Sequence, residues 1–284
     1  MQVRLTGLQR TAMAETLKER INAACVKLYS EGPRSHLGAS EIGEKCKRRL
    51  VYSFRWMGRE VFDGRMLRLF NRGHREEDRI IEWLRAAGLT VHSHTPDGKQ
   101  IRIFQDQHHG GSLDGVALLP PEMALDMPLV LEIKTHNWKS FRNLLANKVQ
   151  LAKPKHFSQM SEYGWYHSIQ YGLYFAVNKN DDDIYIEIVE LDFAHGESLS
   201  RKAQEIVFAT VLPGRVAGSA AHRDCEFCPM VPICHNGQPA EKNCRSCAHS
   251  RPVAGQDWHC AKFGKDIPKS EIPKGCPMWA EFGK

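Results

Sequence analysis

Three charged residues interrupt apolar segments in the middle of this 284-residue chain. Asp114 follows the stretch G-S-L, and Glu132 and Lys134 lie within the apolar run L-V-L-E-I-K-T. In a strand, Glu132 and Lys134 share one face, while Leu131 and Ile133 point to the other. If Asp114 lies on the neighbouring strand, the two carboxylates converge and suit a Mg²⁺ or Mn²⁺ ion between them. A lysine beside that ion can orient water or neutralise charge that develops on a phosphate.

These residues also allow a purely structural interpretation. Glu132 and Lys134 would then be an exposed pair on one face of a strand, and Asp114 a turn residue before Gly115. Because a D…E-x-K pattern is short and common, the three residues alone do not decide between the two. His136 continues the same alternation, and it could touch a ligand or simply end the strand in solvent.

Four of the nine cysteines could form one metal site. Cys225, Cys228 and Cys234 have the spacing C-x2-C-x5-C, and both tetrahedral zinc and a cubane iron–sulfur cluster need a fourth ligand. Cys46, far upstream in K-C-K-R-R-L, is the candidate. Since a reducing cell interior disfavours disulfides, metal binding is the better expectation, and the spacing alone fits zinc as well as a cluster.

A second quartet of cysteines follows near the C-terminus. Its spacing, C-x2-C-x12-C-x15-C, is typical of a small zinc ribbon or knuckle, and its members are Cys244, Cys247, Cys260 and Cys276. His259 or His249 could replace one of these cysteines. The remaining thiol, Cys25, falls on the apolar side of a predicted helix and is expected to be a core residue.

Basic residues are concentrated between residues 45 and 75. That segment holds ten Lys and Arg against two acidic residues, whereas the whole chain has a net charge of +6. Aromatic residues are interleaved with them, namely Tyr52, Phe54, Trp56, Phe62 and Phe70. The pattern fits phosphate contacts with stacking surfaces, and it also fits a solvated basic face over an aromatic core.

Hydrophobic periodicity gives the elements that must position these residues. Helices are predicted over 9–30, 40–54, 76–87, 141–148, 157–178 and 197–211, and strands in IRIF, GSLDGVALL, LVLEIKT and IYIEIVELD. The first helix has an apolar face of Met13, Leu17, Ile21, Ala24 and Leu28. In the third, Ile80, Ile81 and Trp83 or Leu84 point inward and Gly88 ends the helix. The order of elements means a mixed α/β fold.

Composition excludes several classes of protein. At 42% hydrophobic and 25% charged residues the chain is globular, and no apolar run reaches the length of a membrane span. The N-terminal residues lack a signal-peptide core, so we expect a cytoplasmic protein. The sequence has no G-x-x-x-x-G-K-[ST], H-E-x-x-H or G-x-S-x-G motif. The last seventy residues lack the periodicity of a conventional core, so bound metal must substitute for one.

The segments GSLDG and LEIKT together resemble the PD-(D/E)XK nuclease superfamily, and more closely its RecB-like and lambda-exonuclease (YqaJ)-like branches. LGASEIGEKCKRRL is similar to the motif at the substrate entrance of the phage exonucleases, around Gly38, Ala39 and Ser40. R-G-H-R-E-E resembles the family's R-G-x-x-x-E, which places Glu77 near the metals, with Glu76 as the alternative. H-S-I-Q-Y-G-L-Y matches Q-x-x-x-Y, which implies that Gln170 and Tyr174 lie one helical turn apart and face the site.

This resemblance implies a fold and a set of roles. The fold is a mixed central sheet flanked by helices, with an N-terminal helical layer, in a nuclease domain over 1–240 and a zinc module over 241–284. Asp114, Glu132 and the Ile133 carbonyl would bind the catalytic Mg²⁺ or Mn²⁺, with Glu77 acting directly or through water. Lys134 would position the attacking water, and Gln170 and Tyr174 would hold the scissile phosphate or the lysine. The implied DNA contacts are Ser40, Lys47, Arg48, Arg49 and Arg72.

The first cysteine quartet resembles the split pattern of AddB and of the iron–sulfur nucleases of CRISPR adaptation. The resemblance implies a [4Fe-4S] cluster on Cys46, Cys225, Cys228 and Cys234 that joins the two ends of the nuclease domain. Zinc is expected at the second quartet.

The predicted function is a metal-dependent DNA exonuclease of phage or bacterial recombination and repair. Such enzymes usually supply a single-strand annealing recombinase. Two alternatives stay open: a CRISPR-adaptation-type or structure-specific nuclease that trims single strands, and a DNA-end-binding module that does not cleave. The lambda type forms a toroidal trimer, and the additional cluster and zinc module speak against that assembly here.

Overall fold

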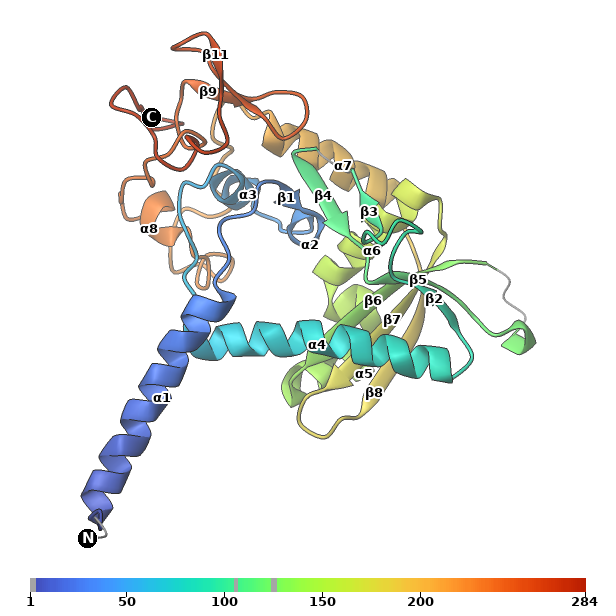
Figure 1. Cartoon of the computed structure of the whole chain (residues 1–284). Helices are drawn as coiled ribbons and strands as arrows, with labels where there is room; N and C mark the ends of the chain where they lie inside the picture. Colours follow the sequence, from blue (N-terminus) through green and yellow to red (C-terminus); the bar gives the residue numbers. More distant parts are fainter. Residues whose placement is uncertain (1–3, 105–106, 124–126) are drawn as a thin grey trace. The chain divides into compact units, whose positions relative to one another are not determined.

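The computed structural model describes residues 4–104, 107–123 and 127–284. Two compact units are formed, the first from residues within 1–32 and 60–79, the second from residues 33–59 and 80–284. Figure 1 shows the elements coloured along the chain. Since the catalytic candidates Asp114, Glu132 and Lys134 all belong to the second unit, that unit can be examined by itself.

The first unit consists of α1 (Gly7–Tyr29) and the first turns of α4 (Gly64–Ala86). Asn22 of α1 contacts α4 so closely that a Cβ on Gly64 would lie 2.3 Å from its carbonyl oxygen. Cys25 is the buried residue of α1, as predicted. The prediction of a buried apolar face is wrong, because α4 is the partner of α1 in this unit and covers the side with Asn22 and Cys25. All five residues of the predicted face are exposed, namely Met13, Leu17, Ile21, Ala24 and Leu28.

A five-stranded sheet forms the centre of the second unit. Its strands are β2 (Thr90–His92), β5 (Gly115–Leu118), β6 (Leu129–His136), β7 (Tyr171–Asn178) and β8 (Ile184–Glu190), in that spatial order. Neighbouring strands are antiparallel except β6 and β7, which are parallel. Parallel strands need a crossover, and α5 (Trp138–Ala152) and α6 (Pro154–His167) provide it. The architecture is therefore mixed α/β, as predicted.

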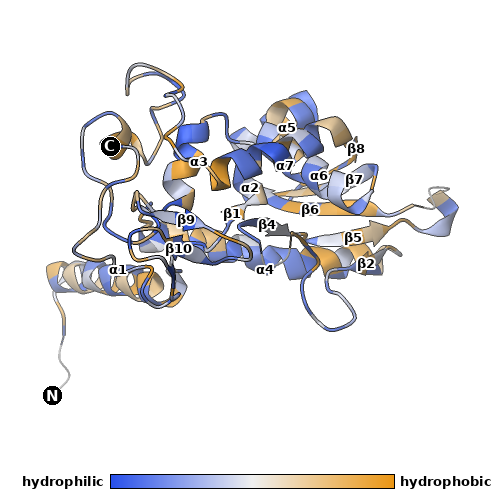
Figure 2. Cartoon of the chain, turned by 90° about the horizontal axis from the view of Figure 1, so that it is seen from above, coloured by the Kyte–Doolittle hydropathy of each residue, from blue (hydrophilic) through white to orange (hydrophobic). Residues whose placement is uncertain are grey.

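The two faces of this sheet have separate cores. Odd-numbered residues of β6, such as Leu131 and Ile133, pack with Ile80, Ile81 and Leu84 of the last turns of α4. Even-numbered residues face α5 and α6, which in Figure 2 lie on the other side of β6. Glu132, Lys134 and His136 thus share the face covered by the crossover helices.

Two smaller sheets and four further helices complete the second unit. One sheet has the order β1-β4-β3, from β1 (Leu37–Gly38), β3 (Arg102–Ile103) and β4 (His109–Ser112). The other is antiparallel, from β9 (Ser250–Pro252), β10 (Trp258–Cys260) and β11 (Lys265–Ile267). The helices are α2 (Ala39–Ile42), α3 (Lys47–Phe54), α7 (Phe193–Val207) and α8 (Val231–Cys234), and Pro121–Met123 is a 3₁₀ turn.

The C-terminal region does share in a conventional core, contrary to the prediction. Trp258, Ile272 and Phe282 belong to one buried cluster with Phe54 and Met57 near the N-terminus. The predicted domain boundary at residue 240 accordingly falls inside the second unit. Periodicity failed here because these apolar residues are spaced singly along loops and short strands.

Two buried arginines lie within this cluster. The Arg55 guanidinium donates to the carbonyls of Arg245, Cys247 and Ser250, and Arg245 donates to the carbonyl of Ser35 at 3.0 Å. The Arg245 Cζ atom lies 4.5 Å from the Phe54 ring centroid, and similar distances separate it from the rings of Trp56 and Trp258. Burial lowers the pKa of Arg245 to about 9 and that of Arg55 to about 10.

Several predicted helices differ from those observed. The predicted helix 157–178 ends at His167, and residues 171–178 form β7 instead. Ser168 stops the helix with a left-handed φ of 57°. The helix predicted over 40–54 is divided into α2 and α3, and the one predicted over 76–87 is the end of the much longer α4. Gly88 ends α4 at a φ of 92°, as predicted. Of the two alternatives for the inward position, Leu84 is buried and Trp83 is 37% exposed.

Candidate active site

Asp114, Glu132 and Lys134 meet where β5 and β6 pair. Asp114 lies in the turn between β4 and β5, and its Oδ2 accepts a 2.7 Å hydrogen bond from the Ile133 amide of β6. The Lys134 Nζ atom lies 2.5 Å from Glu132 Oε1, 3.7 Å from Asp114 Oδ2 and 2.9 Å from the Ile133 carbonyl oxygen. Three oxygen atoms therefore surround one cationic group.

These three oxygens are the ones expected to bind a metal ion. Two carboxylates and a carbonyl form an all-oxygen donor set, which suits Mg²⁺ or Mn²⁺ rather than a thiol-binding metal. The Glu132 side chain has no exposed surface, whereas Asp114 is 15% and Lys134 27% exposed. The arrangement thus fits a divalent cation that the buried Glu132 binds from the interior, with solvent and substrate reaching it past Asp114 and Lys134.

Two residues of α6 that were not predicted also belong to this site. Gln159 donates to the hydroxyl of Tyr163 at 3.1 Å, and that hydroxyl donates to the Ser112 carbonyl at 3.0 Å, two residues before Asp114. Burial, together with the negative charges of Glu132 and Asp114, raises the pKa of Tyr163 well above its usual range. The Tyr163 hydroxyl therefore stays protonated beside both carboxylates.

Gly111 makes this contact between α6 and β4 sterically feasible. A Cβ at Gly111 would lie 2.5 Å from the Tyr163 hydroxyl oxygen and 2.7 Å from the Ala39 Cβ. Ala39, in the segment resembling the substrate-entrance motif, is buried, and the adjacent Ser40 is exposed and accepts a hydrogen bond from Arg34. Close packing thus explains why small residues occur in this segment.

The prediction that Gln170 and Tyr174 lie one helical turn apart is wrong. Gln170 is an exposed residue between α6 and β7, and Tyr174 is a buried residue of β7 that pairs in register with Glu132. The spacing Q-x-x-x-Y also occurs at Gln159 and Tyr163, and there it lies on a helix. The signal was present in the sequence, but the adjacent match at 170–174 obscured it.

Tyr174 belongs to a buried polar network beside the carboxylates. Its hydroxyl lies 3.0 Å from His136 Nε2 and 2.8 Å from His156 Nδ1. Ser140 contacts the other nitrogen of His136 at 3.2 Å. His136 is only 8% exposed, so neither predicted role, a DNA contact or a solvated strand end, matches its position. The network connects β6, β7, α5 and α6.

We expect this network to make the fold sensitive to acid. Burial, followed by the charges of Lys153, Lys179 and Lys134, lowers the pKa of His136 to about 4. The unfolded chain takes up a proton near pH 6.5 and the folded chain does so only near pH 4, so stability is lost as pH falls between these values. This histidine alone should account for about 3 kcal/mol.

Urea unfolding at about pH 7 and about pH 4.5 measures this loss. The variant His136→Asn should show a smaller pH dependence than the unmodified chain. Equal pH dependence in the two proteins would contradict the assignment.

Glu77 belongs to the first unit, where it lies on α4. Its carboxylate is 3.6 Å from His74 Nδ1 and its side chain is 33% exposed. The alternative residue, Glu76, is ion-paired with Arg72 and Arg79. Helical spacing places Glu77 on the same side of α4 as Ile81 and Leu84. Its predicted role at the metal site, with Glu76 as the alternative, stays a prediction.

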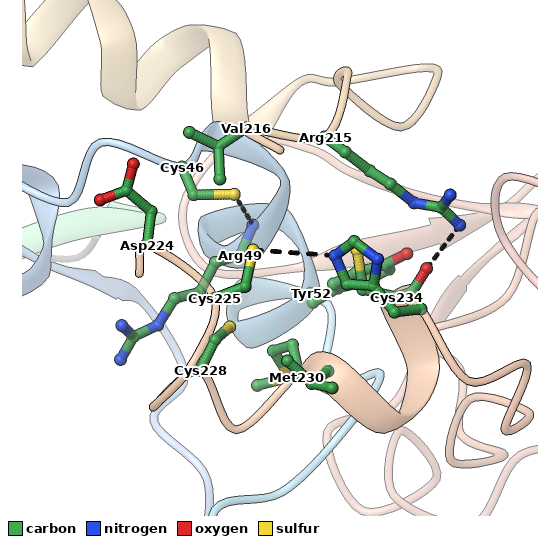
Figure 3. Close-up of a pocket in the computed structure, with 12 residues that line it drawn as sticks. Cys46, Arg49, Tyr52, Arg215, Val216, Asp224, Cys225, Cys228, Met230 and Cys234 are labelled. Atoms are coloured by element: carbon green, nitrogen blue, oxygen red, sulfur yellow. Dashed lines mark hydrogen bonds between the residues drawn. The ribbon is translucent and has the colours of Figure 1, made fainter. Parts of the chain in front are cut away.

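The cysteines of the first quartet line one pocket. Figure 3 shows Cys46, Cys225, Cys228 and Cys234 around it, with Arg49 beside them. Cys46 is the N-cap of α3, and its sulfur accepts a hydrogen bond from the Arg49 amide. Burial and the neighbouring thiols raise the pKa of Cys225. The chain thus brings Cys46 to three cysteines about 180 residues downstream, and four thiols suit zinc or an iron–sulfur cluster.

The second quartet is gathered around the β9-β10-β11 sheet. Cys247 precedes β9 and Cys260 ends β10. Burial raises the pKa of Cys244, and the neighbouring thiols of Cys276, Cys247 and Cys260 raise it further. The four thiols of the quartet are therefore close enough to influence one another electrostatically. The Nδ1 atom of His259, an alternative ligand in the sequence prediction, lies 2.8 Å from Asp266 Oδ1. Among the described residues, no group of three or more His, Cys, Asp or Glu side chains is arranged as around a bound metal ion.

Most of the basic residues expected to contact DNA in the second unit have partners within the chain. Arg48 donates to Tyr52 and to the Pro213 carbonyl, Arg49 pairs with Glu44, and Lys47 pairs with Glu205. The aromatic residues Tyr52 and Phe54 are 2% exposed, so their interpretation as stacking surfaces is wrong. They form the core under the basic residues. Nowhere in the described ranges is a helix long and apolar enough to span a membrane.

The comparisons with known proteins are sparse. No family model and no curated protein matches this sequence. The chain is similar in structure to an alkaline exonuclease from Laribacter hongkongensis, LHK-Exo, with a TM-score of 0.44 and 16% identity over 66% of this chain and 90% of that one. The same enzyme in complex with dAMP gives a TM-score of 0.42 and 17% identity with the same coverage. SSO0001 gives 0.42 and 16% over 78% of this chain and 98% of its own.

Proposed function

We propose that this protein is a metal-dependent nuclease that hydrolyses phosphodiester bonds at DNA ends. The observation that carries the proposal is the convergence of Asp114 Oδ2, Glu132 Oε1 and the Ile133 carbonyl on the ammonium of Lys134. An exposed ion pair of ordinary strand residues would leave Glu132 in solvent, whereas its side chain is fully buried. Burying a carboxylate costs free energy, so a role in cation binding accounts for its position.

The residues of the site divide the reaction between them. Asp114, Glu132 and the Ile133 carbonyl would hold Mg²⁺ or Mn²⁺, which when bound polarises the phosphate and lowers the pKa of bound water. Lys134 would orient the attacking water and neutralise the charge that develops on the phosphate oxygens. Tyr163, bonded to the Ser112 carbonyl and to Gln159, would fix the backbone that carries Asp114. Glu77 is proposed to assist directly or through water.

The cysteine sites are proposed to be structural. The first quartet would hold a [4Fe-4S] cluster that connects α3 to the region around α8, and the second would hold zinc against the β9-β10-β11 sheet. Phosphodiester hydrolysis needs no electron transfer, so neither site is assigned a chemical step. Iron, acid-labile sulfide and zinc measured in anaerobically purified protein, with Cys46→Ser as the comparison, test both assignments.

The nuclease assay uses anaerobically purified protein with linear and circular DNA labelled at the 5′ or the 3′ end. We expect degradation of linear DNA in Mg²⁺ or Mn²⁺, with loss of activity in EDTA. Mononucleotide products would identify an exonuclease, and discrete fragments would identify the structure-specific alternative. DNA that is bound but uncut in every metal would refute cleavage and favour the end-binding module. Recombination or repair, with an annealing recombinase as partner, is the setting that we propose.

A further inference from the structure

Five arginines lie on one side of α4 in the first unit. They are separated by three, four, three and four residues, which on an α-helix confines them to an arc of about 80° and a length of about 21 Å. All five side chains are exposed. We refer to them as the arginine stripe: Arg65, Arg68, Arg72, Arg75 and Arg79.

Carboxylates neutralise only part of the stripe. Glu76 Oε1 lies 3.9 Å from Arg72 Nε and 3.4 Å from Arg79 NH1. Arg68 donates to a neutral group, the Asn22 side chain, at 2.8 Å. Within the described ranges, Arg65, Arg68 and Arg75 form no ion pair. Three of the five arginines therefore present a positive charge to solvent.

Contacts within the first unit involve part of the stripe. Arg68 contacts Asn22 of α1, and Arg72 and Arg79 share Glu76. These contacts do not require five exposed arginines in one row, because each ordered side chain loses entropy and repels the next. A polyanion with regularly spaced charges removes this repulsion.

We propose that the arginine stripe binds the phosphate backbone of DNA independently of base sequence. This inference rests on the proposed nuclease function and adds to it a strand-binding site in the first unit, which belongs to neither the carboxylates nor the cysteines. Guanidinium groups form paired hydrogen bonds with phosphate oxygens, and a rigid helix holds them at fixed intervals. Binding of this kind releases counterions and depends strongly on salt.

The test measures DNA affinity against salt concentration in the full-length Lys134→Ala chain, which is expected to bind without cutting. The triple variant Arg65→Gln/Arg68→Gln/Arg75→Gln should reduce the slope of log K against log salt by about 2.7 on duplex DNA, or about 2.1 on a single strand. The matched control removes three exposed arginines of the second unit, with no change of slope expected: Arg201→Gln/Arg223→Gln/Arg251→Gln.

A second variant guards against damage to the fold, since Arg68 contacts α1. Arg65→Gln/Arg75→Gln retains that contact and should give about two thirds of the change in slope. Equal slopes in the triple variant and its control would overturn the inference. The inference would also be overturned if the triple variant lost binding to phosphatidylserine vesicles while its salt slope on DNA stayed the same.

Failure of the proposed function would look different. If the chain with Lys134 intact degrades DNA and the stripe variants show an unchanged salt slope, the nuclease function stands and the arginine stripe is not a DNA-binding site. A chain that neither binds nor cuts DNA loses both.

Discussion

Lys134→Ala should lower the rate of DNA cleavage by at least about 10²–10³-fold while changing DNA affinity by less than about twofold. The ammonium lies within hydrogen-bonding distance of both Glu132 Oε1 and the Ile133 carbonyl, and it also lies near Asp114. Its loss removes a positive charge at the reacting phosphate. Because one lysine contributes little to the binding of a long polyanion, affinity should persist.

The matched control is Lys139→Ala, which removes the same charge from an exposed position five residues away. Single-turnover cleavage of end-labelled DNA and equilibrium binding without divalent metal measure the two effects separately. Cleavage by Lys134→Ala at the rate of the Lys139→Ala control would refute the site.

Arg245→Ala should destabilise the second unit by about 3–5 kcal/mol, a large part of the stability of a typical domain. The side chain fills the space between the rings of Phe54, Trp56 and Trp258, and its truncation leaves a cavity there. It also leaves the Ser35 carbonyl without its donor. Arg245→Met retains most of the volume and should cost much less, because it removes a buried charge along with the hydrogen bonds.

Urea unfolding compares these variants with Arg251→Ala, an exposed arginine whose loss should change stability by less than about 0.5 kcal/mol. A loss below about 1 kcal/mol for Arg245→Ala would contradict a structural role for this cluster.

The elements that sequence reasoning predicted well are those with a clear period. Strand β6 alternates around Glu132 and Lys134, and α4 ends at a glycine with positive φ. The helix predicted over β7 is wrong because Y-G-L-Y-F-A-V lacks the polar alternation of a half-buried strand, as is usual for a strand buried on both faces. No Gly, Pro or Asn marks the end of α6, since Ser168 adopts the left-handed conformation there.

The site residues that lie in one strand were predictable from sequence, and those that depend on helix boundaries or distant contacts were not. Glu132, Ile133 and Lys134 lie in one strand, so their grouping follows from sequence. Gln159 and Tyr163 required knowing where α6 ends. The buried arginines could not be predicted, because their partners are carbonyls and rings up to 211 residues away. Their positive charge resembled that of DNA-contacting residues, and only burial distinguishes the two.

The interleaved core of the second unit has a consequence for synthesis of the chain. Phe54 and Met57 pack against Trp258, Ile272 and Phe282. During translation the early segment therefore leaves the ribosome some 200 residues before its partners exist. Contacts between such distant residues slow folding, and apolar side chains stay exposed to aggregation until then. A nascent chain stalled before residue 258 should accordingly bind chaperones and should not yet be folded, even though the strands around Asp114 and Glu132 have already been synthesised.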